Sequence, residues 1–226
     1  MTSALMNNSA RRITALTALT FLGCSSFLIS ADHPAPSMQS GPALEKLKAG
    51  NARFVAAAES SSKPIRARRT ETAKAQHPFA IIVGCSDSRT SPEILFDQSI
   101  GDLFVVRTAG EVVDNYELGS IEYAVEHLGA RLIVVLGHEN CGAVAAAVAG
   151  ESAPGHVGNI VRTIRPAVEA VRGQPGDQIT NAIRKNVDRV AAEIREKAEL
   201  GSLATEVKVV EAYYVLDTGK VEWLQD

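Results

Sequence analysis

The chain has 226 residues, of which 46% are hydrophobic and 22% are charged, fractions typical of a globular protein with one sizeable core. Its 23 Lys and Arg residues are outnumbered by 26 Asp and Glu residues, which gives a formal net charge of −3. No general positive field is therefore available to hold a phosphate backbone, and this excludes nucleic acid as an expected partner.

The first 31 residues differ in character from the rest. Arg11 and Arg12 precede a short apolar run, Ile13 to Leu22, and the segment contains no Asp or Glu. A positive region, a short apolar region and a small-residue exit near Ala31 are the order of a secretory signal peptide. We therefore predict that residues 1–31 are a signal peptide and that the mature protein is periplasmic or secreted, without a membrane span.

Two alternatives stay open for this segment. The apolar stretch could extend from Ile13 to Ile29 and act as a membrane anchor, although a bilayer-spanning helix needs about 20 apolar residues. Cys24 follows Leu22-Gly23, an arrangement that loosely resembles a lipoprotein box and would anchor the protein through Cys24. The export route is also undecided, because the residues after the paired arginines match the twin-arginine motif poorly.

Residues 32–42 contain Pro and Ser and few apolar residues, which predicts a linker, and the folded domain is expected over residues 43–226. Apolar residues then recur at helix-like spacings through about Ser60. The basic stretch that follows, Lys63 to Arg69, is interpreted as a solvated loop. The expected helix rests on Leu44, Leu47, Phe54 and Val55.

Three runs are continuously apolar and rich in β-branched residues, as strands buried on both faces are. They are Phe79 to Val83, Leu103 to Val106 and Leu132 to Leu136. Between the second and third, Leu118 to Leu128 has apolar residues spaced for one helical face, and a long helix is expected from about Ile179 to Leu200. This alternation predicts an α/β fold with a mainly parallel central β-sheet flanked by helices.

The C-terminal segment differs, because only a short turn separates its two apolar runs. Val207 to Leu216 and Val221 to Leu224 flank Asp217-Thr218-Gly219, a sequence typical of a hairpin turn. The C-terminal strand is therefore expected to be antiparallel to its neighbour.

Polar residues that can carry chemistry directly follow two of the predicted strands. The first strand runs into Gly84-Cys85-Ser86-Asp87-Ser88-Arg89, and the third runs into Gly137-His138-Glu139-Asn140-Cys141. In open parallel sheets, ligands gather outside the carboxyl ends of the strands. If the two strands are adjacent, both polar segments lie together at one edge of the sheet.

Cys85, His138 and Cys141 supply two thiolates and one imidazole, which are ligand types that zinc prefers. Three protein ligands leave a fourth position open, and an open position is typical of catalytic zinc, since structural sites normally have four protein ligands. Cys141 is also expected at a helix start, where the helix dipole favours a thiolate. The alternative is a disulfide between the two cysteines, which is common in exported proteins.

With these residues in place, the sequence resembles the β-class carbonic anhydrases, in which Cys-x-Asp-x-Arg is followed further along by His-x-x-Cys. Cys85 to Arg89 and His138 to Cys141 match this pattern fully, and the match is densest from Gln76 to Val144. The resemblance, to a plant-like bacterial branch, extends from about Ala43 onward. It implies reversible hydration of CO2 to bicarbonate and a proton, with one Zn²⁺ per subunit.

The resemblance also implies roles for individual residues. Asp87 and Arg89 are expected to act in catalysis by orienting the reacting water, and Asp87 is expected as a fourth zinc ligand in a closed form. Gln76, Phe104 and Tyr123 match residues that line the substrate pocket. Because that pocket is assembled across a dimer interface in the family, we expect a homodimer or a dimer of dimers.

Two positions depart from the family pattern. Ile82 stands where the bicarbonate-inhibited branch has a tryptophan, which puts that allosteric site in doubt, and Glu111 stands where the family usually has Asn. Other functions also stay open. A carbon disulfide-type hydrolase would keep every zinc ligand and differ only in access to the pocket, whereas the intact motif argues against a non-catalytic zinc or bicarbonate-binding protein or a thiol redox protein.

Overall fold

A computed structural model of the chain describes residues 34–150 and 153–225. The predicted signal peptide, with Cys24, lies outside the described residues, so export stays a prediction. Within the described ranges, no helix combines the length and the apolar character needed to cross a bilayer.

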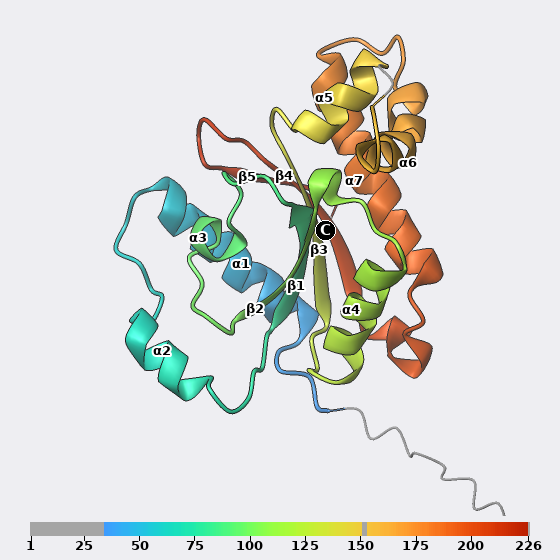
Figure 1. The fold of residues 1–226 in the computed structure, drawn as a ribbon. Coiled ribbons are helices and arrows are strands. Elements are labelled where there is room, and N and C mark those ends of the chain that lie inside the picture. The colour runs from blue at the N-terminus through green and yellow to red at the C-terminus, as the bar shows by residue number, and fades with distance from the viewer. Residues whose placement is uncertain (1–33, 151–152, 226) are drawn as a thin grey trace, which may run out of the picture. The chain divides into compact units, whose positions relative to one another are not determined.

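Five strands form one sheet in the order β2-β1-β3-β4-β5 (Figure 1). The first four strands are parallel, and β5 is antiparallel to β4. Every residue of β1 and β3 is buried, as expected for continuously apolar strands covered on both faces. The predicted α/β fold with a C-terminal antiparallel strand is thus confirmed. The strands are β1 (Ala80–Cys85), β2 (Leu103–Thr108), β3 (Leu132–His138), β4 (Lys208–Tyr214) and β5 (Val221–Gln225).

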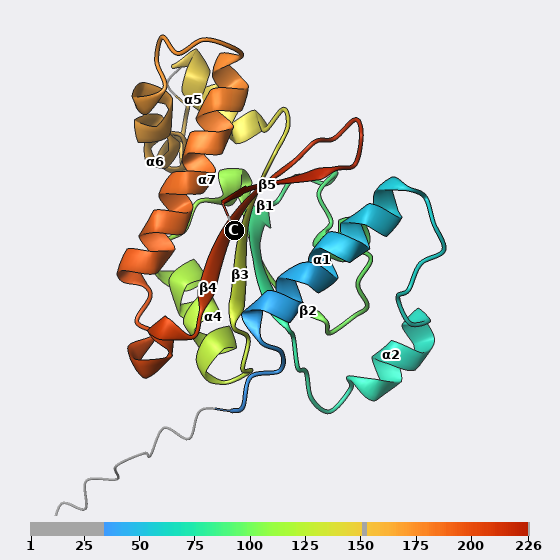
Figure 2. The ribbon, with the colours of Figure 1, turned by 180° about the vertical axis from the view of Figure 1, so that it is seen from behind.

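Helices cover both faces of the sheet (Figures 1 and 2). On one face, Ile82 belongs to the same apolar cluster as residues of α1 (Ser40–Val55). On the other, Ile81 belongs to the cluster formed with α4 (Asn115–Glu126) and α7 (Gln178–Lys197). Successive residues of a strand point to opposite faces, so one buried strand serves both clusters.

A third helical group lies beyond the carboxyl ends of β1 and β3 (Figure 1). It consists of α5 (Gly142–Ala149), α6 (Val157–Ala170) and the start of α7, and its apolar cluster includes Cys85 and Cys141. The helix start expected at Cys141 is the start of α5, whereas the extent of α5 and the presence of α6 were not predicted. Helix α5 contains only Gly, Ala and Val and has no polar face, and α6 contains Pro166, a residue that normally interrupts helices.

The N-terminal part requires one correction. The stretch interpreted as a solvated loop, Lys63 to Arg69, largely forms α2 (Ile65–Glu71). None of the residues of α2 is buried, so no apolar periodicity marks it as a helix. Arg68 attaches it instead, by donating to Asp102 Oδ1 at 2.7 Å and to the carbonyl of Ile100 at 2.9 Å.

Helix α1 begins at Ser40, inside the stretch expected as a linker, and it ends before the expected Ser60. Ser37 donates through its hydroxyl to the carbonyl of Pro78 at 2.6 Å, so the chain is attached to the domain before the helix begins. Position 43 as the start of the domain stays a prediction. The remaining short elements are α3 (Pro92–Leu95), η1 (Ala109–Glu111) and η2 (Gly201–Thr205).

Candidate metal centre

Two adjacent strands and one helix start bring the predicted metal ligands together. Cys85 is the last residue of β1, and His138 is the last residue of the neighbouring β3. Cys141 is the N-cap of α5, and Asn140 before it has φ 54°, a left-handed conformation that Asn tolerates better than most residues. The ligand atoms of Cys85, His138 and Cys141 all lie within 4.8 Å of one another, and all three residues are buried.

The imidazole of His138 is oriented as a metal ligand. Its Nδ1 lies 2.8 Å from the carbonyl oxygen of Glu139, and because a carbonyl only accepts, Nδ1 carries the proton. Nε2 therefore presents a lone pair, yet this buried atom has no hydrogen-bond partner. Leaving a buried acceptor unsatisfied is costly, and a bound cation removes that cost.

Cys85 and Cys141 are free cysteines whose Sγ atoms lie 4.0 Å apart, so the disulfide alternative is not what the structure contains. The hydrogen bond between the two thiols lowers the pKa of Cys85 below its usual value, and the same contact raises the pKa of Cys141. One thiol of the pair thus ionises readily, whereas the second needs a nearby cation to do so. Two such thiols and one imidazole lone pair fit Zn²⁺.

Asp87 lies beside this cluster and is held by Arg89. The guanidinium donates from Nε to Asp87 Oδ1 at 2.8 Å and from Nη2 to Oδ2 at 2.7 Å. These bonds hold the pKa of Asp87 well below its ordinary range, so the carboxyl group is ionised. Asp87 Oδ2 is also 3.9 Å from His138 Nε2, which places the carboxylate next to the ligand atoms.

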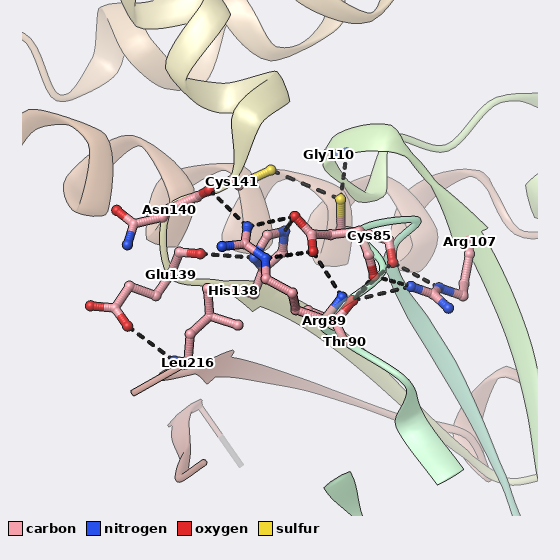
Figure 3. A network of polar contacts seen from close by, with 11 residues as sticks. Cys85, Arg89, Thr90, Arg107, Gly110, His138, Glu139, Asn140, Cys141 and Leu216 are labelled. Atoms are coloured by element: carbon pink, nitrogen blue, oxygen red, sulfur yellow. Dashed lines mark hydrogen bonds and ion pairs between the residues drawn. The ribbon is translucent and has the colours of Figure 1, made fainter. Parts of the chain in front are cut away.

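Arg107 fixes the loop that carries Cys85 and Asp87, a role that no pattern in the sequence predicts. From β2, its Nε donates to the carbonyl of Cys85 at 2.8 Å, and its Nη2 donates to the carbonyl of Asp87 at 2.6 Å (Figure 3). Nη2 also lies 3.2 Å from the hydroxyl of Thr90. The only hint of this role in the sequence is that a charged residue, Arg107, directly follows the apolar run Leu103 to Val106.

The three predicted pocket residues lie away from the ligands of their own chain. Gln76 is exposed and precedes β1, whereas Cys85 ends that strand, whose six residues span about 17 Å. Phe104 pairs in register with Ile81, near the start of β1. Tyr123, on α4, is 47% exposed, and its ring centroid is 6.3 Å from that of Phe104. Within one chain, Phe104 and Tyr123 contact each other, and Gln76 lies near Leu103 at the start of β2.

A mainly parallel sheet with a buried Cys, His and Cys cluster at its carboxyl edge defines an α/β zinc enzyme whose ligand set leaves a position for a reacting group. A family model described as carbonic anhydrase matches residues 80–221. Curated carbonic anhydrases provide full-length relatives. The Mycolicibacterium smegmatis enzyme is 41% identical over 83% of this chain and 94% of its own length. Carbonic anhydrase 2 of Mycobacterium tuberculosis is 41% identical over 82% and 93%.

Solved structures agree with this assignment. A β-carbonic anhydrase of Aspergillus fumigatus, CafA, has a TM-score of 0.65 at 25% identity, covering 81% of this chain and 89% of its own. A Coccomyxa β-carbonic anhydrase in complex with acetazolamide has a TM-score of 0.65 at 26% identity, covering 81% and 85%. The chain belongs to the carbonic anhydrase family, in its β class. The resemblance identified from the sequence is confirmed, and the enzyme's cofactor is zinc.

Proposed function

We propose that this carbonic anhydrase hydrates CO2 reversibly to bicarbonate and a proton, with Asp87 orienting the attacking water. The observation that carries the proposal is an ionised carboxylate, locked by Arg89, 3.9 Å from the unpartnered Nε2 of His138. Zinc held by Cys85, His138 and Cys141 supplies Lewis acidity that turns water into a nucleophile near neutral pH.

Asp87 acts by accepting a hydrogen bond from the attacking water, which directs a lone pair of that water toward the carbon of CO2. Arg89 keeps both carboxylate oxygens occupied, so Asp87 does not turn toward the metal ligands. Released from Arg89, Asp87 would be free to serve as a fourth ligand of a bound zinc ion, in a closed form that would exclude the reacting water. Because two thiolates offset the charge of the cation, we expect hydration to rise through mildly alkaline pH and to fall at acidic pH.

We further propose that a second copy of the chain completes the substrate pocket. Phe104 and Tyr123 contact each other beside β2, and Gln76 lines a hollow with Leu103 at the start of that strand, so all three lie away from the metal ligands of their own chain. Strand β2 is an edge strand whose partner is β1, and α4 beside it exposes Tyr116 as well as Tyr123. Exposed aromatic residues beside a free strand edge suit a protein interface. The enzyme is then a homodimer or a dimer of dimers.

Mixed dimers test the shared pocket. Cys85→Ser removes a zinc ligand but keeps Gln76, whereas Gln76→Ala keeps the ligands. A mixed dimer of these two inactive variants combines one intact zinc centre with Gln76 from the other copy. Co-expression should restore about a quarter of wild-type activity, because about half of the dimers are mixed and each has one complete site.

The matched control combines Cys85→Ser with His138→Ala, since no subunit in that mixture has all three ligands. It should recover no activity. If Cys85→Ser and Gln76→Ala also recover none, although light scattering shows mixed dimers, Gln76 does not act across the interface.

The reaction is tested by stopped-flow CO2 hydration on mature protein of known zinc content, with carbon disulfide assayed in parallel. We expect CO2 hydration to depend on zinc and carbon disulfide to be unreactive. Turnover of carbon disulfide without CO2 hydration would instead favour the hydrolase alternative.

We also propose that the protein is exported and loses its first 31 residues. The support is the order of charged, apolar and small residues in that segment. Mass spectrometry of native protein should find an N-terminus after about Ala31. An intact chain in the cytosolic fraction contradicts export, and a lipid on Cys24 makes the protein an anchored lipoprotein instead.

A further inference from the structure

Among the described residues, two buried side-chain polar atoms have no hydrogen-bond partner: His138 Nε2 and Glu111 Oε2. The metal centre accounts for the first. The second belongs to a carboxyl group in a fully buried residue with 0% exposure, and burial raises the pKa of Glu111 to about 7. Burying such a group without full hydrogen bonding destabilises the fold.

The backbone of Glu111 carries a second cost. Its φ is 44°, in the left-handed region, where a long side chain is less stable than Gly or Asn. Residues held in such conformations persist where the surrounding structure determines them, and they concentrate at functional sites. The unpartnered buried oxygen and the left-handed backbone are two independent sources of destabilisation at Glu111. Their coincidence indicates that the Glu111 side chain has a functional role.

The contacts of Glu111 lead to the metal centre. Its Oε1 accepts a hydrogen bond from Asn186 Nδ2 at 2.8 Å, and the same Nδ2 donates to the carbonyl of Gly110 at 2.9 Å. Both hydrogens of the amide are therefore used, and they attach the η1 turn to α7. From that turn, the backbone N–H of Gly110 donates to Cys85 Sγ at 3.3 Å.

We propose that Glu111 and Asn186 are a positioning pair, which fixes the η1 turn so that the Gly110 N–H supports the sulfur of Cys85. The carboxyl group acts through its acceptor oxygen, so an uncharged group of the same shape can replace it. The inference rests on the metal centre, and it does not depend on the roles proposed for Asp87 or Gln76.

Tight packing around the η1 turn explains why Glu111 and Asn186 can fix its position. A Cβ atom at Gly137 would lie 2.6 Å from Val187 Cγ2, so this glycine lets α7 approach β3 and brings Asn186 to η1. A Cβ atom at Gly110, whose φ is 71°, would lie 2.7 Å from Ile164 Cδ1 on α6. The turn therefore has little room to shift when its hydrogen bonds are intact.

The test uses the holoenzyme and its cobalt-substituted form, because thiolate-to-cobalt and d–d absorption bands report the geometry of the ligands. Glu111→Ala and Asn186→Ala should shift these bands and weaken zinc affinity, measured by chelator competition, by about 10-fold or more. Glu111→Gln keeps the acceptor and should retain the wild-type spectrum and an affinity within about twofold. Glu111→Met, similar in size but without the acceptor, replaces the alanine variant if that variant does not fold.

The matched control is Glu211→Ala. Glu211 is also a buried carboxyl group, 4% exposed, and it accepts hydrogen bonds from Arg195 at 3.0 Å, away from the ligands. This variant should lose stability but keep the cobalt spectrum and zinc affinity. Wild-type spectra and affinities in folded Glu111→Met and Asn186→Ala overturn the proposal. Failure of Glu111→Gln to behave as wild type overturns the acceptor role. The activity of Asp87 or Gln76 variants has no bearing on these results, because the test measures cobalt spectra and zinc affinity in the Glu111 and Asn186 variants.

Discussion

The metal ligands and the predicted pocket residues occupy opposite ends of β1 and differ in how complete they are within one chain. At the carboxyl end, Cys85, His138 and Cys141 are at most 6% exposed, and all come from the same chain. Near the other end, Gln76 is exposed and Tyr123 is 47% exposed, and neither lies in the cluster of metal ligands. The contrast indicates that metal binding belongs to one subunit, whereas we propose that substrate recognition requires two.

Removing a ligand should have the largest effect. Cys85→Ser, His138→Ala and Cys141→Ser should each lose zinc and reduce activity by about 1,000-fold or more, because the two remaining ligands hold the ion poorly. Zinc analysis and stopped-flow hydration measure both losses. His127→Ala, at an exposed histidine that follows the end of α4 and lies outside the cluster, should retain full zinc. A ligand variant that keeps stoichiometric zinc and full activity contradicts the assignment.

Asp87→Ala should separate chemistry from metal binding. We expect full zinc but a rate lower by about 100-fold, since the reacting water loses its orientation. Arg89→Ala should also depress the rate at every pH, because Asp87 is then free to reach the closed form. If Asp87→Ala keeps wild-type activity and an unchanged pH profile, the proposed orienting role is wrong.

Substitution of the exposed pocket residue Tyr123 should reduce activity by a smaller factor, and the reduction should depend on the partner copy. Tyr123→Ala should lower kcat/KM by about 10-fold at unchanged zinc content, since it removes one wall of the pocket. Mixed dimers with Cys85→Ser should recover the wild-type kcat/KM per intact zinc centre. Tyr116→Ala is the matched control for loss of an exposed interface aromatic, because Tyr116 is also on α4 and is 88% exposed but matches no pocket residue. Equal losses in both tyrosine variants would contradict a specific pocket role for Tyr123.

Asp97, remote from both regions, should affect stability alone. Burial would raise its pKa, but hydrogen bonds from Ser60, Ser61 and Arg53 lower the pKa well below its usual value. Its folded-state pKa thus lies below the unfolded value of about 3.9, so its stabilisation is present above that pH and is lost as the pH falls. Asp97→Asn should lower the free energy of unfolding at pH 7 by about 1–3 kcal/mol, with zinc and activity unchanged.

Urea unfolding tests the sign of this effect. The destabilisation by Asp97→Asn should be smaller by about 1 kcal/mol at pH 3 than at pH 7, because the unfolded carboxyl group is then mostly protonated. An equal or larger destabilisation at pH 3 would show that the charge of Asp97 does not contribute to stability through its bonds to Ser60, Ser61 and Arg53.

Local patterns were sufficient for the strands and the ligands. Continuous apolar runs predicted β1, β2 and β3. Strands buried on both faces, as β1 and β3 are, need apolar residues at every position, whereas β2 is only partly buried. Cys85 and His138 could then be placed together, since both directly end strands that are neighbours in a parallel sheet. Two cysteines and one histidine predicted zinc as the metal, because zinc prefers such ligands. The spacing of the motif predicted the carbonic anhydrase family.

Only the tertiary structure showed which distant side chains hold the metal ligands in place. The contact from Asn186 to Glu111 joins residues 75 positions apart, and that from Arg107 to the carbonyl of Cys85 joins residues 22 apart. Such contacts depend on how closely α7 packs against β3 and on the register of β2 with β1. Sequence periodicity reports which face of an element is buried, but it contains no information on which distant side chain meets that face. The separation of Gln76 from the metal ligands emerged for the same reason.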